Sequence, residues 1–283
     1  MLDQEAVGRC VRRALEEDLG TGDVTSRGVV PEGARAVGRF VAREPLVVAG
    51  LPVAREVFRR VGGGLAFETL VDDGTTCSAG AVIATVRGEA RPLLEGERTA
   101  LNFLQRLSGI ATVTRALVDR VKGTMLQIAD TRKTVPGLRV LDKYAVAVGG
   151  GTNHRAGLFD AWLIKDNHWR LAGGVGAALR RARAALGGRP APGVGLEIEV
   201  GTIEEVREAL DAGADALLLD NMDEETLRRA VELARGRAFL EVSGNVLPER
   251  LEALARLGVD RVSFGALTHS VRAVDIALEV EGA

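Results

Sequence analysis

The chain has few cysteines and few aromatic residues. Its 283 residues include two cysteines, two tryptophans, one tyrosine and seven phenylalanines. Cys10 and Cys77 lie far apart, and neither has a second cysteine or a histidine at the spacing of metal ligands. The sequence therefore indicates neither a zinc site nor a disulfide framework, and we expect a reducing compartment.

Long apolar runs and an excess of one charge are also missing. No apolar stretch reaches the roughly 18 residues of a membrane span, and the start, MLDQEAVGRC, lacks the features of a signal peptide. We therefore expect a cytoplasmic protein outside the membrane. The 37 basic residues nearly balance 39 acidic ones, for a net charge of -2. This balance gives no overall attraction to nucleic acid or anionic lipid, so an anionic ligand requires a local cluster of cations.

The N-terminal part combines a helix with short strands. Apolar residues at three- and four-residue spacing predict an amphipathic helix over residues 3–18. Strand patterns follow at residues 37–43, 65–71 and 81–88. We predict a small α+β domain over residues 1–105, joined by a C-terminal helix over residues 270–283.

A helical pattern from Glu97 toward Val121 leads into repeated strand-then-helix units. The six apolar strand candidates lie at residues 125–129, 161–164, 194–200, 216–219, 238–242 and 261–264. Apolar strands that alternate with amphipathic helices are typical of a parallel sheet buried on both faces. We therefore predict an α/β fold with an irregular (β/α) barrel over residues 106–269, in which fewer than eight strands can close the barrel.

The sequence offers five potential cations, three of which follow predicted strands, where a barrel of this kind carries its chemistry. They are Arg132, Lys133, His154, Arg155 and Lys165. Guanidinium groups suit the geometry of carboxylates and phosphates, so the cluster predicts a substrate with several negative charges. A single Arg or Lys in a loop is usually a solvated charge, and the argument therefore depends on the cluster.

Carboxylates and small residues end the remaining strands. Glu199 and Asp220 end neighbouring strands and suit a magnesium ion shared with phosphates, or ribose hydroxyls. Ser243-Gly244 and Gly265 each stand before an expected helix, whose N–H groups and positive end predict a site for a terminal phosphate.

Three other features have two readings. Glu197 can simply share a strand face with Glu199, and His168 fits a structural role as well as a catalytic one. The glycines at 149–151 suggest a nucleotide loop, but they follow a helix, so we interpret them as a flexible connector.

Several motifs resemble the signature of quinolinate phosphoribosyltransferases. The central ones are DTRKTVPGLR at 130–139, GGGTNHR at 149–155 and LIKDNH at 163–168. Further matches are ERTALNFL at 97–104, LSGIAT at 107–112, KYAV at 143–146, EIEV at 197–200, LDNM at 219–222, EVSG at 241–244 and FGALTHS at 264–270. They follow the family's order over nearly the whole chain. Val135 departs from the pattern, because threonine is common there, but it carries no charge.

The resemblance implies a fold and a set of site residues. The fold is a small open α/β sandwich domain followed by the irregular barrel. Arg132, Lys133, His154, Arg155 and Lys165 would line the quinolinate pocket, and Arg98 would come from the other subunit of a homodimer with shared active sites. Glu199 and Asp220 would bind Mg²⁺ and the ribose, while Ser243, Gly244, Gly265 and His269 would hold the 5-phosphate. Lys133, Lys165, Glu199 and Asp220 form the implied catalytic set, and the assembly beyond a dimer is left open.

The implied reaction transfers a phosphoribosyl group from phosphoribosyl pyrophosphate (PRPP) to quinolinate with decarboxylation. It yields nicotinate mononucleotide, pyrophosphate and CO₂ for NAD biosynthesis, with Mg²⁺ and no organic cofactor. One alternative is a homologue associated with molybdate transport genes, which would act on another acceptor and need fewer cations. A second is a non-catalytic phosphosugar-binding barrel, which would have no use for Glu199 together with Asp220.

Overall fold

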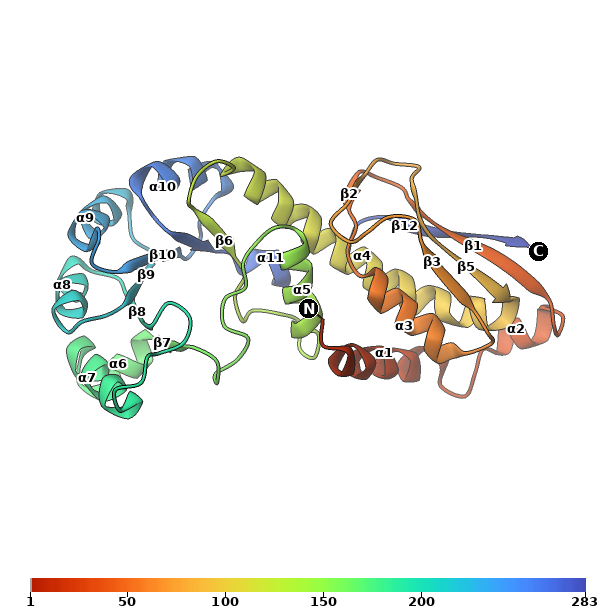
Figure 1. Ribbon diagram of the computed structural model, residues 1–283, viewed down its shortest axis with the longest axis horizontal. Coiled ribbons are helices and arrows are strands. Elements are labelled where there is room, and N and C mark those ends of the chain that lie inside the picture. Colours follow the sequence, from red (N-terminus) through yellow and green to blue (C-terminus); the bar gives the residue numbers. More distant parts are fainter. Residues whose placement is uncertain (1) are drawn as a thin grey trace. The chain divides into compact units, whose positions relative to one another are not determined.

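The computed structural model describes residues 2–283 and divides into two compact units (Figure 1). Unit 1 comprises the chain up to Ala116, Lys133–Gly151 and Ala266–Ala283. Unit 2 comprises Leu117–Arg132 and Thr152–Gly265. The segment at 133–151, which carries part of the central motif, thus belongs with the N-terminal unit.

Unit 1 is built on a four-stranded antiparallel sheet with the order β12-β1-β5-β3. Its strands are β1 (Arg35–Ala42), β3 (Ala66–Thr69), β5 (Val82–Glu89) and β12 (Ile276–Gly282), and the short β2 (Leu46–Val47) and β4 (Thr76–Cys77) pair separately. Its helices are α1 (Gln4–Leu19), α2 (Val24–Val29), α3 (Leu51–Val61), α5 (Arg139–Val148) and α11 (Ala266–His269), and α4 (Ala90–Arg120) runs on into unit 2.

Aromatic residues form part of the unit 1 core. Phe40 on β1 and Phe58 on α3 are buried, and their ring centroids lie 5.9 Å apart in an edge-to-face arrangement. Phe67 on β3 stacks on Phe58 at 5.7 Å. These contacts hold α3 against the sheet.

The predicted C-terminal helix is wrong, because this segment forms β12. Strand β12 pairs antiparallel with β1, from Ile276 opposite Ala42 to Gly282 opposite Ala36. The segment is rich in alanine, leucine and glutamate, which favour helices, but its apolar residues Ile276, Leu278 and Val280 alternate. The backbone groups along the outer side of β1 take part in this pairing, and the tertiary contact overrides the local preference.

Unit 2 contains a six-stranded parallel sheet with the order β6-β11-β10-β9-β8-β7, which confirms the predicted α/β barrel. The strands are β6 (Gln127–Ala129), β7 (Trp162–Ile164), β8 (Leu196–Val200), β9 (Ala216–Asp220), β10 (Phe239–Ser243) and β11 (Arg261–Ser263). The helices are α6 (Asp166–Ala172), α7 (Val175–Leu186), α8 (Ile203–Asp211), α9 (Glu224–Ala234), α10 (Leu251–Leu257) and the 3₁₀ helix η1 (Pro248–Arg250). Figure 1 shows the helices arranged around the outside of the curved sheet.

A further bridge joins Ala129 of β6 to Thr152, so the chain just before His154 runs beside the sheet.

Within residues 2–283, no helix is both long and apolar enough to cross a membrane.

Candidate active site

Lys165 and Glu199 meet at the carboxyl ends of β7 and β8. Lys165 Nζ lies 2.9 Å from Glu199 Oε2, and the Glu199 side chain is 14% exposed. The Lys165 backbone N–H donates to His168 Nδ1 at 2.8 Å, so His168 closes the first turn of α6. This contact supports the structural reading of His168.

Asp220 adjoins the Ser243-Gly244 loop. Asp220 and Ser243 are opposite each other at the ends of β9 and β10. Asn221 connects the two strand ends, because its backbone N–H donates to Ser243 O at 3.2 Å and its Nδ2 donates to Asp220 Oδ2 at 2.8 Å. Gly244 has φ of +86°, and a Cβ there would lie 2.3 Å from Asn221 Oδ1. Only glycine fits this turn without rearrangement.

Helices follow both loops of the predicted phosphate site, and both are short. After Gly244, the 3₁₀ helix η1 begins at Pro248 and continues directly into the seven-residue α10 at Leu251. The helix after Gly265, α11, has four residues. Because α11 is short and η1 starts at Pro248, away from Gly244, we expect loop N–H groups and side chains to supply most contacts to an anion there.

Arg132 and Arg155 bring two positive charges close together. Arg155 is 9% exposed, and its burial lowers its pKa. The charge of Arg132 lowers this pKa further, whereas Glu197 and Asp160 act in the opposite direction. A ligand with two carboxylates would relieve the repulsion between the guanidinium groups.

Asp130 fixes the segment that carries His154 and Arg155. Its side chain is fully buried and accepts from the His154 backbone N–H at 2.8 Å and from Asn153 Nδ2 at 2.7 Å. The sequence reasoning did not include Asp130 among the site residues. Its position directly after β6 was the available signal.

The predicted site residues also left out two buried carboxylates. Glu197 on β8 and Glu241 on β10 are 1% and 0% exposed. Burial and the charge of Glu197 raise the pKa of Glu241 from 4.5 to about 7. Acidic residues on two otherwise apolar strands could have pointed to these positions. The sequence could not show that they lie close together, because the fold of the barrel determines that distance.

Arg98, Lys133 and His269 belong to unit 1. Thr268 Oγ1 donates to the Lys133 carbonyl at 2.8 Å, so the segments that carry Lys133 and His269 are adjacent. The bidentate pair of Arg106 with buried Asp142, at 2.9 Å for both contacts, supports this region. Arg106 also donates to the Thr268 carbonyl at 2.8 Å.

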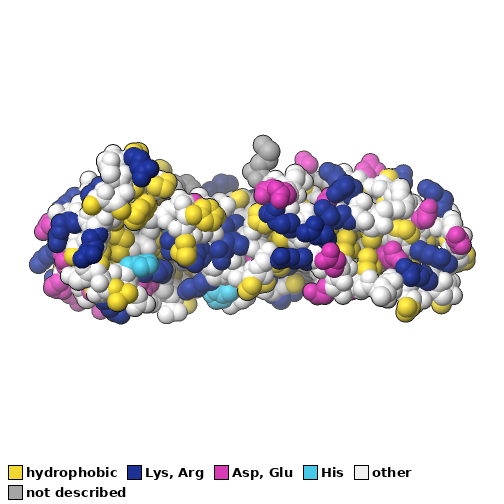
Figure 2. All heavy atoms as spheres, turned by 90° about the horizontal axis from the view of Figure 1, so that it is seen from below, with side chains coloured by type: hydrophobic (Ala, Val, Ile, Leu, Met, Phe, Trp, Pro, Cys, Tyr) yellow, Lys and Arg dark blue, Asp and Glu magenta, His cyan; other side chains and the backbone are white. Residues whose placement is uncertain are grey.

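Unit 1 also contains a basic cavity of about 840 Å³, lined by α1, α4 and residues 134–140. Arg9, Arg13, Arg106 and Arg139 contribute to its wall. Figure 2 shows basic side chains gathered on this face of unit 1. Exposed Arg98 lies on α4 four residues before Asn102, which lines the cavity, so Arg98 lies on the helix face next to it.

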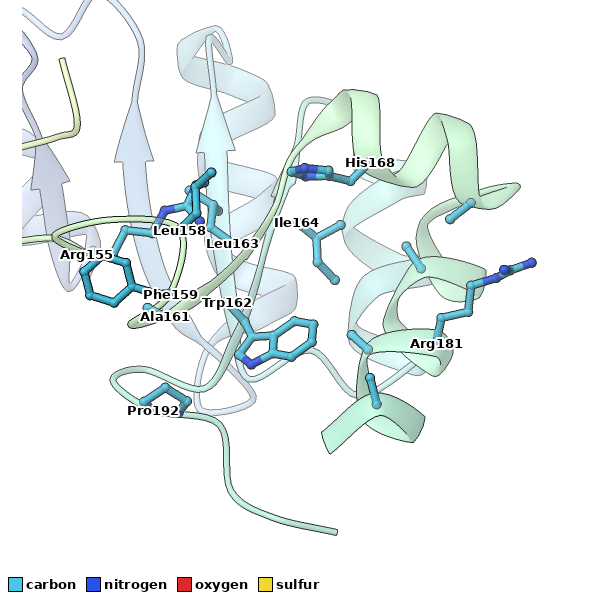
Figure 3. Close-up of a pocket in the computed structure, with 14 residues that line it drawn as sticks. Arg155, Leu158, Phe159, Ala161, Trp162, Leu163, Ile164, His168, Arg181 and Pro192 are labelled. Carbon is cyan, nitrogen blue, oxygen red and sulfur yellow. The ribbon is translucent and has the colours of Figure 1, made fainter. Parts of the chain in front are cut away.

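A second cavity, of about 640 Å³, lies in unit 2 beside β7 (Figure 3). Its lining is mainly apolar and includes Trp162, Ile164 and the exposed Phe159. Arg155 is the one predicted site residue among those that line it. The paired Lys165 and Glu199, and the Asp220 turn, are outside this lining.

Fold and site together are those of an enzyme of the α/β-barrel class. A model of the quinolinate phosphoribosyl transferase C-terminal domain matches residues 110–279, and a model of the N-terminal domain matches residues 23–108. The chain belongs to the quinolinate phosphoribosyltransferase family.

Similar proteins match nearly the full chain. A nicotinate-nucleotide pyrophosphorylase [carboxylating] of Mycobacterium leprae is 46% identical and covers 98% of both chains. A mitochondrial quinolinate phosphoribosyltransferase [decarboxylating] of Nicotiana tabacum is 42% identical over 96% of this chain and 81% of its own. The solved nicotinate-nucleotide pyrophosphorylase of Francisella tularensis has 40% identity, a TM-score of 0.92, and coverage of 99% of this chain and 98% of its own.

Proposed function

We propose that the chain transfers the phosphoribosyl group of PRPP to quinolinate and releases CO₂ and pyrophosphate, with nicotinate mononucleotide as the product for NAD biosynthesis. The observation that carries this proposal is the division of charge in unit 2. Arg132 and Arg155 bring two guanidinium groups together, and Glu199 and Asp220 end neighbouring strands. Family membership and the names of full-length relatives support the same reaction.

The cationic groups suit a pyridine dicarboxylate. In the proposed reaction, the pyridine nitrogen attacks the anomeric carbon of PRPP as pyrophosphate leaves. The pyridinium product stabilises the electron pair left at C2 when the adjacent carboxylate departs as CO₂, and a proton then replaces the carboxylate. The chain's cations hold the acceptor's carboxylates while the bond to the ribose forms.

Glu199 and Asp220 fit the expected magnesium role. Mg²⁺ is commonly held by one or two carboxylates together with substrate phosphates, and these two side chains provide that donor set. When bound, Mg²⁺ would neutralise charge on the pyrophosphate leaving group. Since Lys165 Nζ already contacts Glu199, binding of the substrates has to redistribute this ion pair.

One assay tests the reaction. The protein is incubated with quinolinate, PRPP and Mg²⁺, and release of CO₂ is followed. Nicotinate should be inert, because it lacks the 2-carboxylate that the additional cations hold. Turnover of another acceptor would favour the homologue associated with molybdate transport genes. Sugar-phosphate binding with no turnover of any acceptor would favour a non-catalytic barrel.

The proposed division of roles has its own test. Lys165→Ala should cripple turnover and leave PRPP binding largely intact, because Lys165 acts on the acceptor. Glu199→Gln and Asp220→Asn should weaken magnesium-dependent use of PRPP more than quinolinate binding. Equal magnesium dependence in these variants and the wild type would reject the metal role.

We also propose a homodimer in which Arg98 reaches the partner's active site. Support comes from the exposure of Arg98 and from the basic cavity next to it. Arg98→Ala and Lys165→Ala should each be nearly inactive. In mixed dimers one site would contain both intact residues, so activity should return to about half of that of a wild-type dimer. Mixed dimers without recovery would reject a shared site.

The remaining expectations stay predictions. Lys133 and His269 are expected to contact the acceptor and the 5-phosphate, respectively, and Ser243, Gly244 and Gly265 to surround that phosphate. Light scattering would establish any assembly beyond the dimer. Cell fractionation would test the cytoplasmic location, for which the mitochondrial Nicotiana tabacum relative offers a contrast.

A further inference from the structure

A cluster of four charged or titratable side chains fills part of the barrel interior in unit 2. His154 Nε2 lies 3.3 Å from Glu197 Oε2 and 3.5 Å from Glu241 Oε1. Arg261 on β11 places its Nη1 3.3 Å from Glu241 Oε2. We call His154, Glu197, Glu241 and Arg261 the buried cluster. Four groups of this kind are costly to bury, so their retention calls for a functional explanation.

The buried cluster lies one layer below the candidate site. Side chains two residues apart on a strand share a face. Glu197 stands two residues before Glu199 on β8, and Glu241 stands two residues before Ser243 on β10. The carboxylates therefore project into the barrel beneath the strand ends that carry the predicted metal and phosphate residues.

The hydrogen bonds of His154 determine which nitrogen carries the proton. The Arg155 backbone N–H donates to His154 Nδ1 at 2.7 Å, so Nδ1 acts as an acceptor. Burial alone would lower the pKa of His154, but Glu197 and Glu241 raise it. The Nδ1 contact favours the neutral ring, and Nε2 lies within 3.5 Å of a carboxylate oxygen of both Glu197 and Glu241.

This arrangement argues against a metal ion in the buried cluster. The possible ligand atoms of His154, Glu197 and Glu241 lie within 4.8 Å of one another. A metal on Nε2 would require the hydrogen on Nδ1, where it would oppose the Arg155 N–H. Arg261 also places a positive charge beside Glu241. The buried cluster is therefore an ion-pair network.

The network acts on Arg155 in two ways. His154 connects the carboxylates to the Arg155 backbone through its two ring nitrogens. The charge of Glu197 also offsets the repulsion that Arg155 experiences from Arg132. Removing either carboxylate should loosen the Arg155 guanidinium without touching Asp220 or the Gly244 turn.

We propose that Glu197 and Glu241 are positioning residues that act through His154 to hold Arg155 where the acceptor's carboxylates bind. This inference rests on the proposed function. It assigns His154 an indirect role, because both ring nitrogens are engaged by the chain itself.

The test uses Glu197→Gln and Glu241→Gln, which keep the shape of each side chain and remove its charge, and it is run at about pH 8, above the pKa of about 7 of Glu241. Quinolinate KM, and quinolinate Kd measured by calorimetry, should rise on the order of tenfold, while kcat at saturating quinolinate and KM for PRPP change less than about twofold. The matched control is Glu204→Gln on α8, an exposed glutamate outside the buried cluster, which should leave all these constants unchanged.

Three results would overturn the positioning role. They are unchanged quinolinate affinity in both glutamine variants, an equal loss of quinolinate and PRPP affinity, and a divalent metal that copurifies with the wild type but not with Glu241→Gln. If a glutamine variant does not fold, His154→Gln and His154→Leu give the same test. The glutamine keeps an N–H near the Nε2 position and should retain more quinolinate affinity, and equal affinities would also overturn the proposal. Wild-type protein inactive on quinolinate would instead reject the proposed function.

Discussion

Phenylalanines fill part of the interior of unit 1, whereas charged side chains occupy part of the barrel interior of unit 2. Phe40 and Glu241 are both 0% exposed, and Phe58 and Glu197 are both 1% exposed. Burial of the rings contributes free energy directly through removal of apolar surface from water. Burial of carboxylates contributes little net stability, because desolvation opposes the ion pairing. The buried rings thus stabilise unit 1, whereas we interpret the equally buried carboxylates of unit 2 as groups that maintain the geometry of the site.

Truncation of the apolar core of unit 1 should have the largest effect on stability. Phe58→Ala should reduce the free energy of unfolding by about 3–5 kcal/mol, since it leaves a cavity between α3 and the sheet. Chemical denaturation measures this loss. The control is Phe159→Ala, because Phe159 is 88% exposed and its truncation should change stability by less than about 0.5 kcal/mol. Similar losses in both variants would contradict the core assignment.

The pH dependence of stability tests the charged interior. The pKa of Glu241 is about 7 in the folded chain, against an ordinary value of 4.5, so folding favours its protonated form. Its stabilising contribution is complete below pH 4.5 and is lost as pH rises through about 7. The loss is at most roughly 3 kcal/mol.

Denaturation midpoints between pH 5 and 8 would check this, with Glu241→Gln as the variant that loses this part of the slope. Glu204→Gln is the matched control and should keep the wild-type slope. An identical pH dependence in Glu241→Gln and the wild type would show that Glu241 does not titrate in this range.

Two glycine substitutions distinguish the effect of backbone strain on stability from the effect of the turn at Gly244 on substrate binding. Gly244→Ala places a Cβ 2.3 Å from Asn221 Oδ1 and should raise KM for PRPP about tenfold, or about 1.4 kcal/mol. Gly236 also has a positive φ, of +70°, but nothing lies within 4 Å of its added Cβ. Gly236→Ala should therefore reduce stability by about 1 kcal/mol and leave KM unchanged. Equal KM values for the two variants would reject the role of the turn.

The smallest effect is expected for an exposed ion pair of unit 1. Arg39 and Glu281 lie 2.9 Å apart across β1 and β12, with side chains 40% and 65% exposed. Solvent and salt screen this pair, so Glu281→Gln should change the free energy of unfolding by less than about 0.5 kcal/mol. A loss as large as that of a buried residue would mean that exposure is a poor guide to the contribution of charges in this protein.

Sequence patterns predicted the regular elements well where they repeat. All six barrel strands lie within or overlap the expected ranges, because each is a short apolar run and most are followed by an amphipathic helix. The C-terminal segment was misread, since Ala, Leu and Glu favour helix and the pairing partner β1 is more than 200 residues away. Local preference contains no information about such a partner.

The site was predicted by residue type more successfully than by environment. Arg132 and Lys165 stood out because these cations follow apolar strands, and Glu199 because a carboxylate stands near the end of one. Glu241 did not, because its significance depends on the barrel placing it beside His154, far away in sequence. Asn221 was also missed, since its role comes from contacts with the neighbouring strand end.

By itself, the sequence determined the alternation of strands and helices, the presence of cations and carboxylates after the strands, and the family whose motifs they form. These features depend on periodicity and on short spacings, which are local properties of the chain. Only the tertiary structure decided that Lys165 pairs with Glu199, that β12 completes the unit 1 sheet, and that two glutamates converge on His154. The physical reason is that burial and the distances between charges arise from packing between remote segments, and these set both the pKa of Glu241 and the orientation of His154.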